Sequence, residues 1–461
     1  MTDDTHQLPP RGFMPTTWQW AHAYFRDPAE IAKHYIRIGV EAQQCRYAPK
    51  GLDASISERF VQHMLQNPLA EHFVAVVPQG RIWGRNGAVI SPDRYLLWDV
   101  SIEYSKPPFR HTALSQRTMP PLMRIPGTWA VLTCAASDNY YHWMFEVLAR
   151  FELLRQSGIE PDGYVLSMNG GLPFQHETLQ LLGIPPDKLI DCRDFTHIQA
   201  DRLVVPSMGG HTGHAPQFAC EYLRANLLAH CPAEPLEGYE RIYISRSGAE
   251  RRRVLNEADV VRYLEHFGFR SVRPELLTVR EQMRLFSSAS FIVAPHGAAL
   301  TNLIFCRPGT KVVELFPSSY VYPSYWVPSH HVGLDYYYLI GPSYKGPGVW
   351  WEGAEDFVVP LGDLAQLLEL AGLTGASGAP LAEAISRPAA PSLRIAVVLQ
   401  QLMQLEGEQF IAECYRHLLG REPDPAGFYS HLRALRSGMR KAAIVAAIMR
   451  SGEAVRLYQG R

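Results

Sequence analysis

The chain has 461 residues, a formal net charge of −1 at pH 7, and 47% hydrophobic and 19% charged residues. The length predicts about three domains of roughly 150 residues each, and the composition is that of a globular, core-forming protein. The near-neutral charge excludes a global field that would attract nucleic acid or an acidic membrane surface.

Cysteine usage and the first residues indicate the compartment. The chain has seven cysteines, an odd number, and no CxxC pair, which excludes a disulfide framework and a zinc ribbon. We expect buried thiols in a reducing compartment. The first residues, MTDDTHQLPPRG, are polar, and no run of about 18 apolar residues occurs anywhere. We therefore expect a cytoplasmic protein, with a peripheral contact at the inner face of the membrane left open.

The first half changes pattern twice. Residues 1 to about 60 are rich in aromatic side chains and predict a short helical lead-in. From about 70 to 135, short apolar runs with turn signals at Gln79-Gly80 and Asn86-Gly87 predict a β-meander. After that point strands and helices alternate, which is typical of a parallel sheet with crossover helices. The predicted strands are 129–134, 163–167, 189–190 and 202–206, and the predicted helices are 139–157, 175–182 and 218–230.

The second half repeats this alternation. The predicted strands are 241–245, 269–272, 291–294 and 311–316, and the predicted helices are 257–267 and 279–287. Residues 373–392 are small and Pro-rich, as in a linker, and 393–461 show a helical pattern. The predicted domains are therefore 1–230 and 231–372, then the linker 373–392 and a helical module, 393–461.

The most informative stretch is FIVAPHGAALTNLIFCRPGTKVVELFP, residues 291–317. It predicts a strand, a small-residue turn with His296, Gly297 and Ala298, a helix with Asn302, and a second strand with Glu314. Such a turn lets a ligand approach the backbone, and a helix start offers N–H groups to an anion. A carboxylate near the end of a parallel strand suits a diol. Together they point to a nucleotide sugar.

Two further constellations could carry chemistry. Arg246 follows a predicted strand, and Arg251, Arg252 and Arg253 come shortly after it in the sequence. Their planar guanidinium groups, each with several N–H donors, suit a diphosphate. The alternative is a solvated basic loop.

In the other constellation, His142 and Glu146 share a helix face, with Asp138 near the N-cap. A carboxylate that orients a histidine favours a general base. A purely structural N-cap and ion pair is the alternative, and the absence of a second local histidine argues against a metal.

Weaker candidates follow the predicted strands. His211 and His214 lie in a Gly-containing loop, and His330-His331 is a similar pair, but each has too few ligands for zinc. The aromatic run from Tyr320 to Trp326 could stack on sugar faces or simply pack an irregular segment.

The blocks DNYYHWMFEVLARFELL, RIYISRSGAERRRVLNE and APHGAALTNLIFCRPGTKVVELFP, with LDYYYL after them, resemble glycosyltransferase family 61 over roughly residues 70 to 370. The resemblance implies a GT-B type α/β fold, with two Rossmann-like domains facing a central cleft, followed here by a small all-α domain. It also implies a UDP-sugar donor, inversion, no metal or other cofactor, and a saccharide or lipid-linked glycan acceptor, as in bacterial capsule or exopolysaccharide assembly. The segment FIAECYRHLLGREPDPAGFYSHL resembles a helical module of the DUF4214 type.

The resemblance also implies residue roles. Arg246, Arg252 and Arg253 would hold the diphosphate, while His296, Gly297, Ala298 and Asn302 complete the pocket and Glu314 takes the ribose. His142, supported by Glu146, is the preferred base, with Asp138 and Glu146 as alternatives. A non-catalytic glycan- or nucleotide-binding protein on the same fold is the competing reading, and residues 393–461 are a candidate contact for a protein or a membrane.

Overall fold

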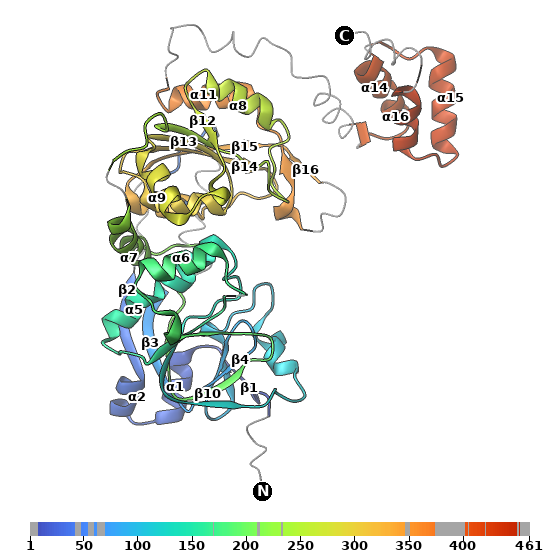
Figure 1. The fold of residues 1–461 in the computed structure, drawn as a ribbon. Helices are drawn as coiled ribbons and strands as arrows, with labels where there is room; N and C mark the ends of the chain where they lie inside the picture. Colours follow the sequence, from blue (N-terminus) through green and yellow to red (C-terminus); the bar gives the residue numbers. More distant parts are fainter. Residues whose placement is uncertain are drawn as a thin grey trace.

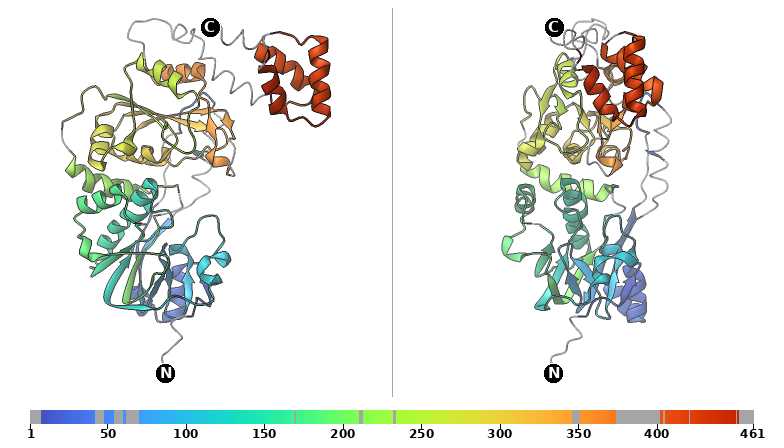
Figure 2. Two further views of the ribbon diagram at one scale, coloured as in Figure 1. Left: turned by 45° about the vertical axis from the view of Figure 1, so that its right-hand side comes forward. Right: turned by 90° about the vertical axis from the view of Figure 1, so that its right-hand side faces the viewer.

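A computed structural model describes residues 8–41, 48–53, 60–61, 70–168, 170–209, 213–231, 234–345, 351–373, 402–403, 405–419, 421–449 and 451. Two sheets, one from each half of the chain, lie end to end in Figures 1 and 2. The predicted linker, except for its first residue, lies outside the described residues, as do His211 and Cys45. Within these described ranges, no helix has the length and apolar character needed to cross a bilayer.

The first sheet has ten strands, in the order β1-β6-β5-β4-β10-β7-β8-β9, with β3 paired to β10 and β2 paired to β3. Its strands are β1 Gly12–Met14, β2 Tyr35–Glu41, β3 Ala70–Pro78, β4 Arg81–Trp83, β5 Ala88–Ile90, β6 Tyr95–Leu97, β7 Met123–Val131, β8 Gly163–Leu166, β9 Leu189–Asp191 and β10 His197–Pro206. Its helices are α1 Thr17–Phe25, α2 Pro28–His34, α4 Tyr140–His142, α5 Arg150–Ser157, α6 Pro173–Leu181 and α7 Gln217–Leu227.

This sheet differs from the prediction of a Rossmann-like first domain. The strands β10, β7, β8 and β9 form a parallel set, whereas β3 and β4 both run antiparallel to β10. At the far edge, β1 and β6 form a separate parallel pair. The predicted meander is present, but its strands join the edge of the parallel set instead of standing apart. The lead-in likewise contributes strands as well as helices, because β2 extends the sheet beside β3. Two equivalent Rossmann-like domains are therefore not confirmed, and the first half is a mixed α/β unit.

The second sheet matches the expectation of an open parallel sheet. Its order is β12-β11-β13-β14-β15 and all its pairs are parallel. The strands are β11 Arg241–Ile244, β12 Arg270–Val272, β13 Phe291–Pro295, β14 Lys311–Pro317 and β15 Asp335–Gly341. A two-stranded ribbon, β16 Ser343–Tyr344 with β17 Asp356–Phe357, follows. After β11 the chain forms β12 on one side of it and then β13 on the other side, so the topological switch point lies between β11 and β13.

Helices cover both faces of the second sheet (Figure 1), and alternating side chains of its strands pack against the two layers. Val293 and Val313 pack with α8 Glu257–Glu265 and α11 Leu361–Leu370, whereas Ile292 and Ala294 pack with α9 Val279–Ser288 on the other face. That second layer also holds a 3-10 helix, Ala298–Phe305, and α10 Trp326–Val332.

The two halves share one hydrophobic core, since a single cluster contains Val74 and Leu132 from the first sheet together with Ile292 and Val312 from the second. Polar contacts also cross between the halves. The Glu177 carboxylate of α6 accepts hydrogen bonds from the backbone N–H groups of Val279 and Arg280, at 2.7 and 3.0 Å. These N–H groups open α9 and have no partner within their own helix, so the carboxylate caps it.

The C-terminal module is formed by α14 Gly407–Leu419, α15 Pro425–Arg436 and α16 Lys441–Met449, drawn in red in Figure 2. Its buried hydrophobic residues, such as Phe410, Leu432 and Ile444, form a cluster drawn entirely from residues 402–448. This agrees with the helical module predicted from the sequence.

Candidate functional site

A cavity of about 500 Å³ lies at the carboxyl ends of β11 and β13, which is the switch point of the second sheet. Open α/β sheets bind ligands at this position. The opposite wall comes from the first half, through the start of α4 and of α6. The lining residues are Asp138, Asn139, Tyr140, Pro173, Phe174, Ile244, Ser245, Arg246, Gly248, Ala249, Pro274, Glu275, Leu277, Gln282, Pro295, Gly297, Ala298 and Ala299.

Arg246 is the cation of this cavity. Its Nη2 and Nε donate to the backbone carbonyls of Arg251 and Arg252, at 2.9 and 3.3 Å, and no carboxylate among the described residues forms an ion pair with it. Burial, followed by the neighbouring Arg252, lowers the pKa of Arg246 to about 10. A β-carbon on Gly297 would overlap Arg246 Nη1, so the glycine is needed for the guanidinium to lie over this turn. The charge is therefore held in place and available to an anion.

The other two predicted diphosphate ligands, Arg252 and Arg253, lie in different surroundings. Arg252 has a left-handed backbone with φ 53°, its Nη1 donates to the carbonyl of Gly353 at 2.8 Å, and its guanidinium lies 5.4 Å from the ring centre of Tyr320. Arg253 instead forms two hydrogen bonds to one oxygen of Asp356, at 2.9 and 2.6 Å. Arg252 therefore remains near the site, whereas the guanidinium of Arg253 already has a carboxylate partner outside the cavity.

His296 and Glu314 form a buried pair beside the turn. His296 Nδ1 and Glu314 Oε1 are 2.5 Å apart, and Tyr336 on β15 donates its hydroxyl to Glu314 Oε2. The Glu314 side chain has no exposed surface. Burial raises the pKa of Glu314 well above its ordinary value. The predicted ribose contact of Glu314 thus stays a prediction, and both of its oxygens already have partners within the protein.

Asn302 connects the two halves and does not line the cavity. Its Oδ1 accepts from the Tyr140 hydroxyl at 2.9 Å, and its Nδ2 donates to Gln282 Oε1 at 2.7 Å. The side chain is fully buried. Tyr140 and Gln282 themselves line the cavity, so Asn302 fixes two of its walls. Ala298 lines the cavity directly, at the start of the 3-10 helix.

The predicted His142–Glu146 pair is present. His142 Nδ1 lies 2.9 Å from Glu146 Oε1, as their spacing of four residues on one helix predicts. The helix is continuous to α5 through a π-helical segment, Trp143–Leu148, in which every residue is buried. Asp138 is exposed at the cavity wall, and the residue that caps the helix is Asn139, whose Oδ1 accepts from the backbone of Tyr141 at 2.9 Å.

Two residues that sequence reasoning did not select complete this group. The Tyr104 hydroxyl and the Cys134 thiol both donate to Glu146 Oε2, at 2.6 and 3.2 Å. Burial raises the pKa of Glu146, but the hydrogen bonds from His142, Tyr104 and Cys134 outweigh it and leave the pKa below its ordinary value. Glu146 is therefore an ionised carboxylate that orients His142. Cys134 is the last residue of a predicted strand, 129–134, a sequence signal that could have drawn attention to it.

Cys134, His142 and Glu146 offer ligand atoms within 4.8 Å of one another, a set that zinc can use. Burial raises the pKa of the Cys134 thiol, which donates to Glu146 as an uncharged group. A buried cation, Arg150, lies nearby and favours the Glu146 carboxylate; it donates to the carbonyls of Val131, Thr133 and Pro206. A metal here would have to displace the thiol proton.

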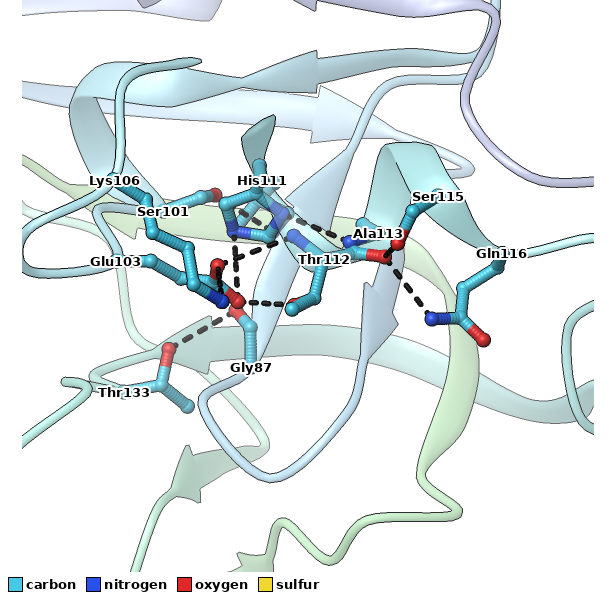
Figure 3. Close-up of polar contacts among 11 residues, drawn as sticks. Gly87, Ser101, Glu103, Lys106, His111, Thr112, Ala113, Ser115, Gln116 and Thr133 are labelled. Carbon is cyan, nitrogen blue, oxygen red and sulfur yellow. Dashed lines mark hydrogen bonds and ion pairs between the residues drawn. The ribbon is translucent and has the colours of Figure 1, made fainter. Parts of the chain in front are cut away.

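The segment that carries Tyr104 is held by a polar network around Glu103 (Figure 3). The Glu103 carboxylate accepts from the Lys106 ammonium at 2.9 Å, from the Thr112 backbone at 3.1 Å, and from the Thr112 hydroxyl. Burial raises the pKa of Glu103, but Thr112, Lys106 and His111 together bring it below its ordinary value. This network fixes the residue next to Tyr104.

Aromatic rings lie between the two histidine groups, which are His142 with Glu146 and His296 with Glu314. Tyr325 lies 5.7 Å from Tyr141 and 5.1 Å from His296, measured between ring centres. Tyr320 and Tyr322 are stacked 6.1 Å apart, and Tyr322 covers Gly213. Part of the predicted aromatic run, Tyr320 to Tyr325, thus lies between the two halves.

The remaining histidine candidates form no metal cluster among the described residues. His214 is buried near Tyr322, 6.3 Å between ring centres, while His330 and His331 lie on α10. They contribute nothing to the cavity wall.

Residues 140–313 match the family described as glycosyltransferase 61, and residues 400–458 match a domain of unknown function, DUF4214. The match to glycosyltransferase 61 covers parts of both halves of the chain. This region includes His142, Glu146, Arg246 and the His296 turn, and it ends one residue before Glu314. The sequence resemblance to this family is thereby confirmed, as is that of the helical module.

Similar curated proteins are eukaryotic glycosyltransferases. A murine protein O-linked-mannose β-1,4-N-acetylglucosaminyltransferase 2 is 32% identical over 262 residues, covering 49% of this chain and 44% of the relative. A β-1,2-xylosyltransferase from Oryza sativa subsp. japonica is 38% identical over 61 residues, 13% of this chain and 11% of the relative. An Arabidopsis thaliana xylan glycosyltransferase is 31% identical over 98 residues, 20% of this chain and 19% of the relative. The chain thus spans less than half the length of these relatives.

Proposed function

We propose that this protein is an inverting glycosyltransferase that moves a sugar from a UDP-sugar to a saccharide acceptor without a metal. The observation that carries the proposal is the cavity at the switch point of the second sheet. There Arg246, which has no carboxylate partner among the described residues, lies over Gly297, and the facing wall is the start of the helix that bears His142 and Glu146. The match of residues 140–313 to glycosyltransferase 61 supports the same reading.

Donor binding follows from the chemistry of the cavity. A diphosphate beside Arg246 and Arg252 would be neutralised by fixed guanidinium groups, which suit phosphate and keep their charge. The apolar part of the wall, with Phe174, Pro274 and Leu277, offers a surface on which a nucleobase can pack. We therefore assign the nucleotide of the donor to this cavity.

The reaction is a single displacement at the anomeric carbon. The acceptor hydroxyl gives its proton to His142 Nε2 while its oxygen bonds to the anomeric carbon and the bond to the diphosphate oxygen breaks. Glu146 accepts the hydrogen bond from Nδ1–H, which leaves the lone pair on Nε2, and a positioned base of this kind contributes about 10²–10⁴-fold. Arg246 and Arg252 stabilise the negative charge that develops on the leaving diphosphate.

A donor screen tests the proposal. Relatives with xylosyl- and N-acetylglucosaminyltransferase names make UDP-xylose and UDP-N-acetylglucosamine the first donors to try. We expect slow UDP release from one UDP-sugar, and transfer, read by product mass, once a saccharide acceptor is added. A folded protein that binds UDP yet never releases it from any donor would instead support the non-catalytic alternative.

Metal independence is a separate expectation. Because the negative charge of the diphosphate is met by guanidinium groups in this scheme, treatment with EDTA should leave the rate within about twofold of its starting value. Metal analysis of the untreated protein is the control. A loss of activity that added Zn²⁺ or Mn²⁺ restores would refute this part of the proposal, and would direct attention to Cys134, His142 and Glu146.

The two-domain GT-B description and a place in cell-surface polysaccharide assembly are part of the same proposal. Both rest on the family resemblance. The parallel second sheet and the cavity between the halves support the first of them.

A further inference from the structure

The His296–Glu314–Tyr336 group is more elaborate than an anion-binding turn requires. Three side chains, from the residue directly after β13 and from β14 and β15, form a continuous chain of hydrogen bonds with Glu314 in the middle. Glu314 has no exposed surface, and only 6% of the His296 side chain is exposed. A carboxylic acid and an imidazole this close can exchange a proton along the bond they share.

The charged and titratable groups around His296 come from every element packed against it. Arg246 and Arg252 approach from the loop after β11, Tyr320 and Tyr325 from the loop after β14, and Glu314 from β14 itself. Burial, then Arg252 and Arg246, hold the pKa of His296 well below its ordinary value, while burial raises the pKa of Glu314. Both directions favour an uncharged pair when no ligand is bound.

In that state His296 presents a polar atom with no partner. The proton of the Glu314 carboxyl points at His296 Nδ1, so the imidazole carries its own proton on Nε2. No hydrogen bond from a described residue reaches Nε2. The neighbouring guanidinium groups of Arg246 and Arg252 also have no ion-pair partner in the described part of the chain. His296 and Arg252 do not line the cavity themselves, but both neighbour Arg246, which does. An anion that reaches past Arg246 to this place would meet two fixed cations and one N–H donor.

We propose that a diphosphate bound beside Arg246 causes the Glu314 proton to move to His296. The pair is thus an internal proton store, and His296 becomes a third cation only while the diphosphate is bound. This inference rests on the proposed donor site. The O–H bond of Glu314 breaks, the Nδ1–H bond of His296 forms, and no proton is exchanged with solvent. His296 then donates from Nε2 to a phosphate oxygen, and Tyr336 stabilises the carboxylate left behind. When UDP departs, the proton returns to Glu314.

The proton transfer avoids a third buried positive charge in the empty site. A permanent imidazolium would add a third buried positive charge beside two arginines in the empty site, and that is costly. The shared proton leaves the empty site with two cations and supplies the third only when an anion is present. Glu314 and Tyr336 are positioning residues in this scheme, whereas His296 touches the donor.

Titration calorimetry with UDP tests the proposal. The measurements are made between pH 7.5 and 8.5, above the range near pH 6 in which a terminal phosphate titrates, in two buffers with different ionisation enthalpies. The wild type should bind UDP with no buffer-dependent heat. His296→Gln should weaken binding about 10- to 100-fold through loss of a charged donor. In Glu314→Gln, His296 can obtain its proton only from solvent, so binding should weaken, show proton uptake, and improve as pH falls.

Two further variants keep the test decisive. Tyr336→Phe removes only the hydrogen bond to Glu314 Oε2 and should weaken UDP binding roughly 2- to 10-fold without proton uptake. It stands in for Glu314→Gln if that variant does not fold. Glu265→Gln, at an exposed glutamate, is the matched control and should bind UDP like the wild type.

The outcomes separate the two proposals. Uptake of about one proton per UDP by the wild type, or unchanged UDP affinity in His296→Gln, would overturn the proton store and leave the donor site intact. A folded wild type that binds no UDP would overturn the donor site itself, and this inference with it.

Discussion

Arg246 and His142 divide the proposed chemistry between the two halves of the chain. Arg246 lines the cavity at the end of β11, while His142 lies in the first half and is held by Glu146 and Tyr104. Their separation means that binding of the nucleotide and activation of the acceptor can be lost independently.

The first prediction uses this separation. His142→Ala should abolish sugar transfer yet leave UDP affinity within a few-fold of wild type, because His142 does not line the cavity. Arg246→Ala should weaken UDP binding itself, by roughly 10- to 100-fold for a lost charge-assisted hydrogen bond. Calorimetry with UDP and a transfer assay on both variants provide the measurement. An equal loss of UDP affinity in the two would contradict the assignment of roles.

Gly297 provides a second prediction at this scale. Its φ of 175° is open to any residue, but an added methyl group would collide with Arg246 Nη1. Gly297→Ala should therefore fold normally and bind UDP about tenfold more weakly, a cost of about 1.4 kcal/mol. Gly362→Ala, on α11 where a β-carbon meets nothing within 4 Å, is the matched control. Unchanged affinity in Gly297→Ala would show that Arg246 does not need its present position.

Glu314 illustrates what residue-level reasoning missed. Its position near the end of a parallel strand predicted a ribose ligand, which stays a prediction. The sequence did not indicate that Tyr336 on β15 and His296, directly after β13, contact its two oxygens. A partner that is supplied by a neighbouring strand has no signal in local spacing.

Among the elements, the helix that begins at Tyr140 matters most. The sequence predicted one amphipathic helix over 139–157, and the helix is indeed continuous, but it includes a π-helical segment in which Ala149 N–H bonds to the Met144 carbonyl. Such segments are rare and are frequent at functional sites. Here Glu146 lies within that segment, at hydrogen-bond distance from Tyr104 and Cys134 as well as from His142.

The segment around Glu103 gives a prediction about stability. Since the folded-state pKa of Glu103 is lowered, its carboxylate stabilises the fold above its unfolded pKa of about 4.3, and this contribution is lost as pH falls through the folded value. Glu103→Gln should thus cost about 1–3 kcal/mol at pH 7, because the donors of Thr112 and Lys106 lose an ionised acceptor. The difference from wild type should shrink below about pH 4.

Denaturant unfolding at several pH values measures this difference. Glu160→Gln, at an exposed glutamate, is the control and should change little. The Glu103 variant should also lower transfer activity by displacing Tyr104. If the stability loss were the same at pH 3 and pH 7, the carboxylate would not be its source.

For the whole molecule, the shared core and the α9 cap fix how the two sheets face each other. The cavity exists only because that arrangement brings α4 and α6 to the carboxyl edge of the second sheet. The C-terminal module differs in this respect, since its buried residues form a cluster of their own.

A deletion tests the independence of that module. Removal of residues 393–461 should leave UDP affinity within about twofold, because neither the cavity nor the two histidine groups include a residue from this part. A protein or membrane contact made through the module would be lost in the same variant, as a pull-down or vesicle assay would show. Loss of UDP binding in a truncated chain that melts like the full one would refute this separation.

The sequence by itself was enough for the parallel second sheet, the helical module and the His142–Glu146 pair, because these depend on local periodicity, turn chemistry and short spacing. Only the tertiary structure decided the mixed character of the first sheet, the pairing of Arg253 with Asp356, and the roles of Tyr104, Cys134 and Tyr336. Each of these depends on residues brought together from distant segments by strand order and core packing, which leave no local pattern in the chain.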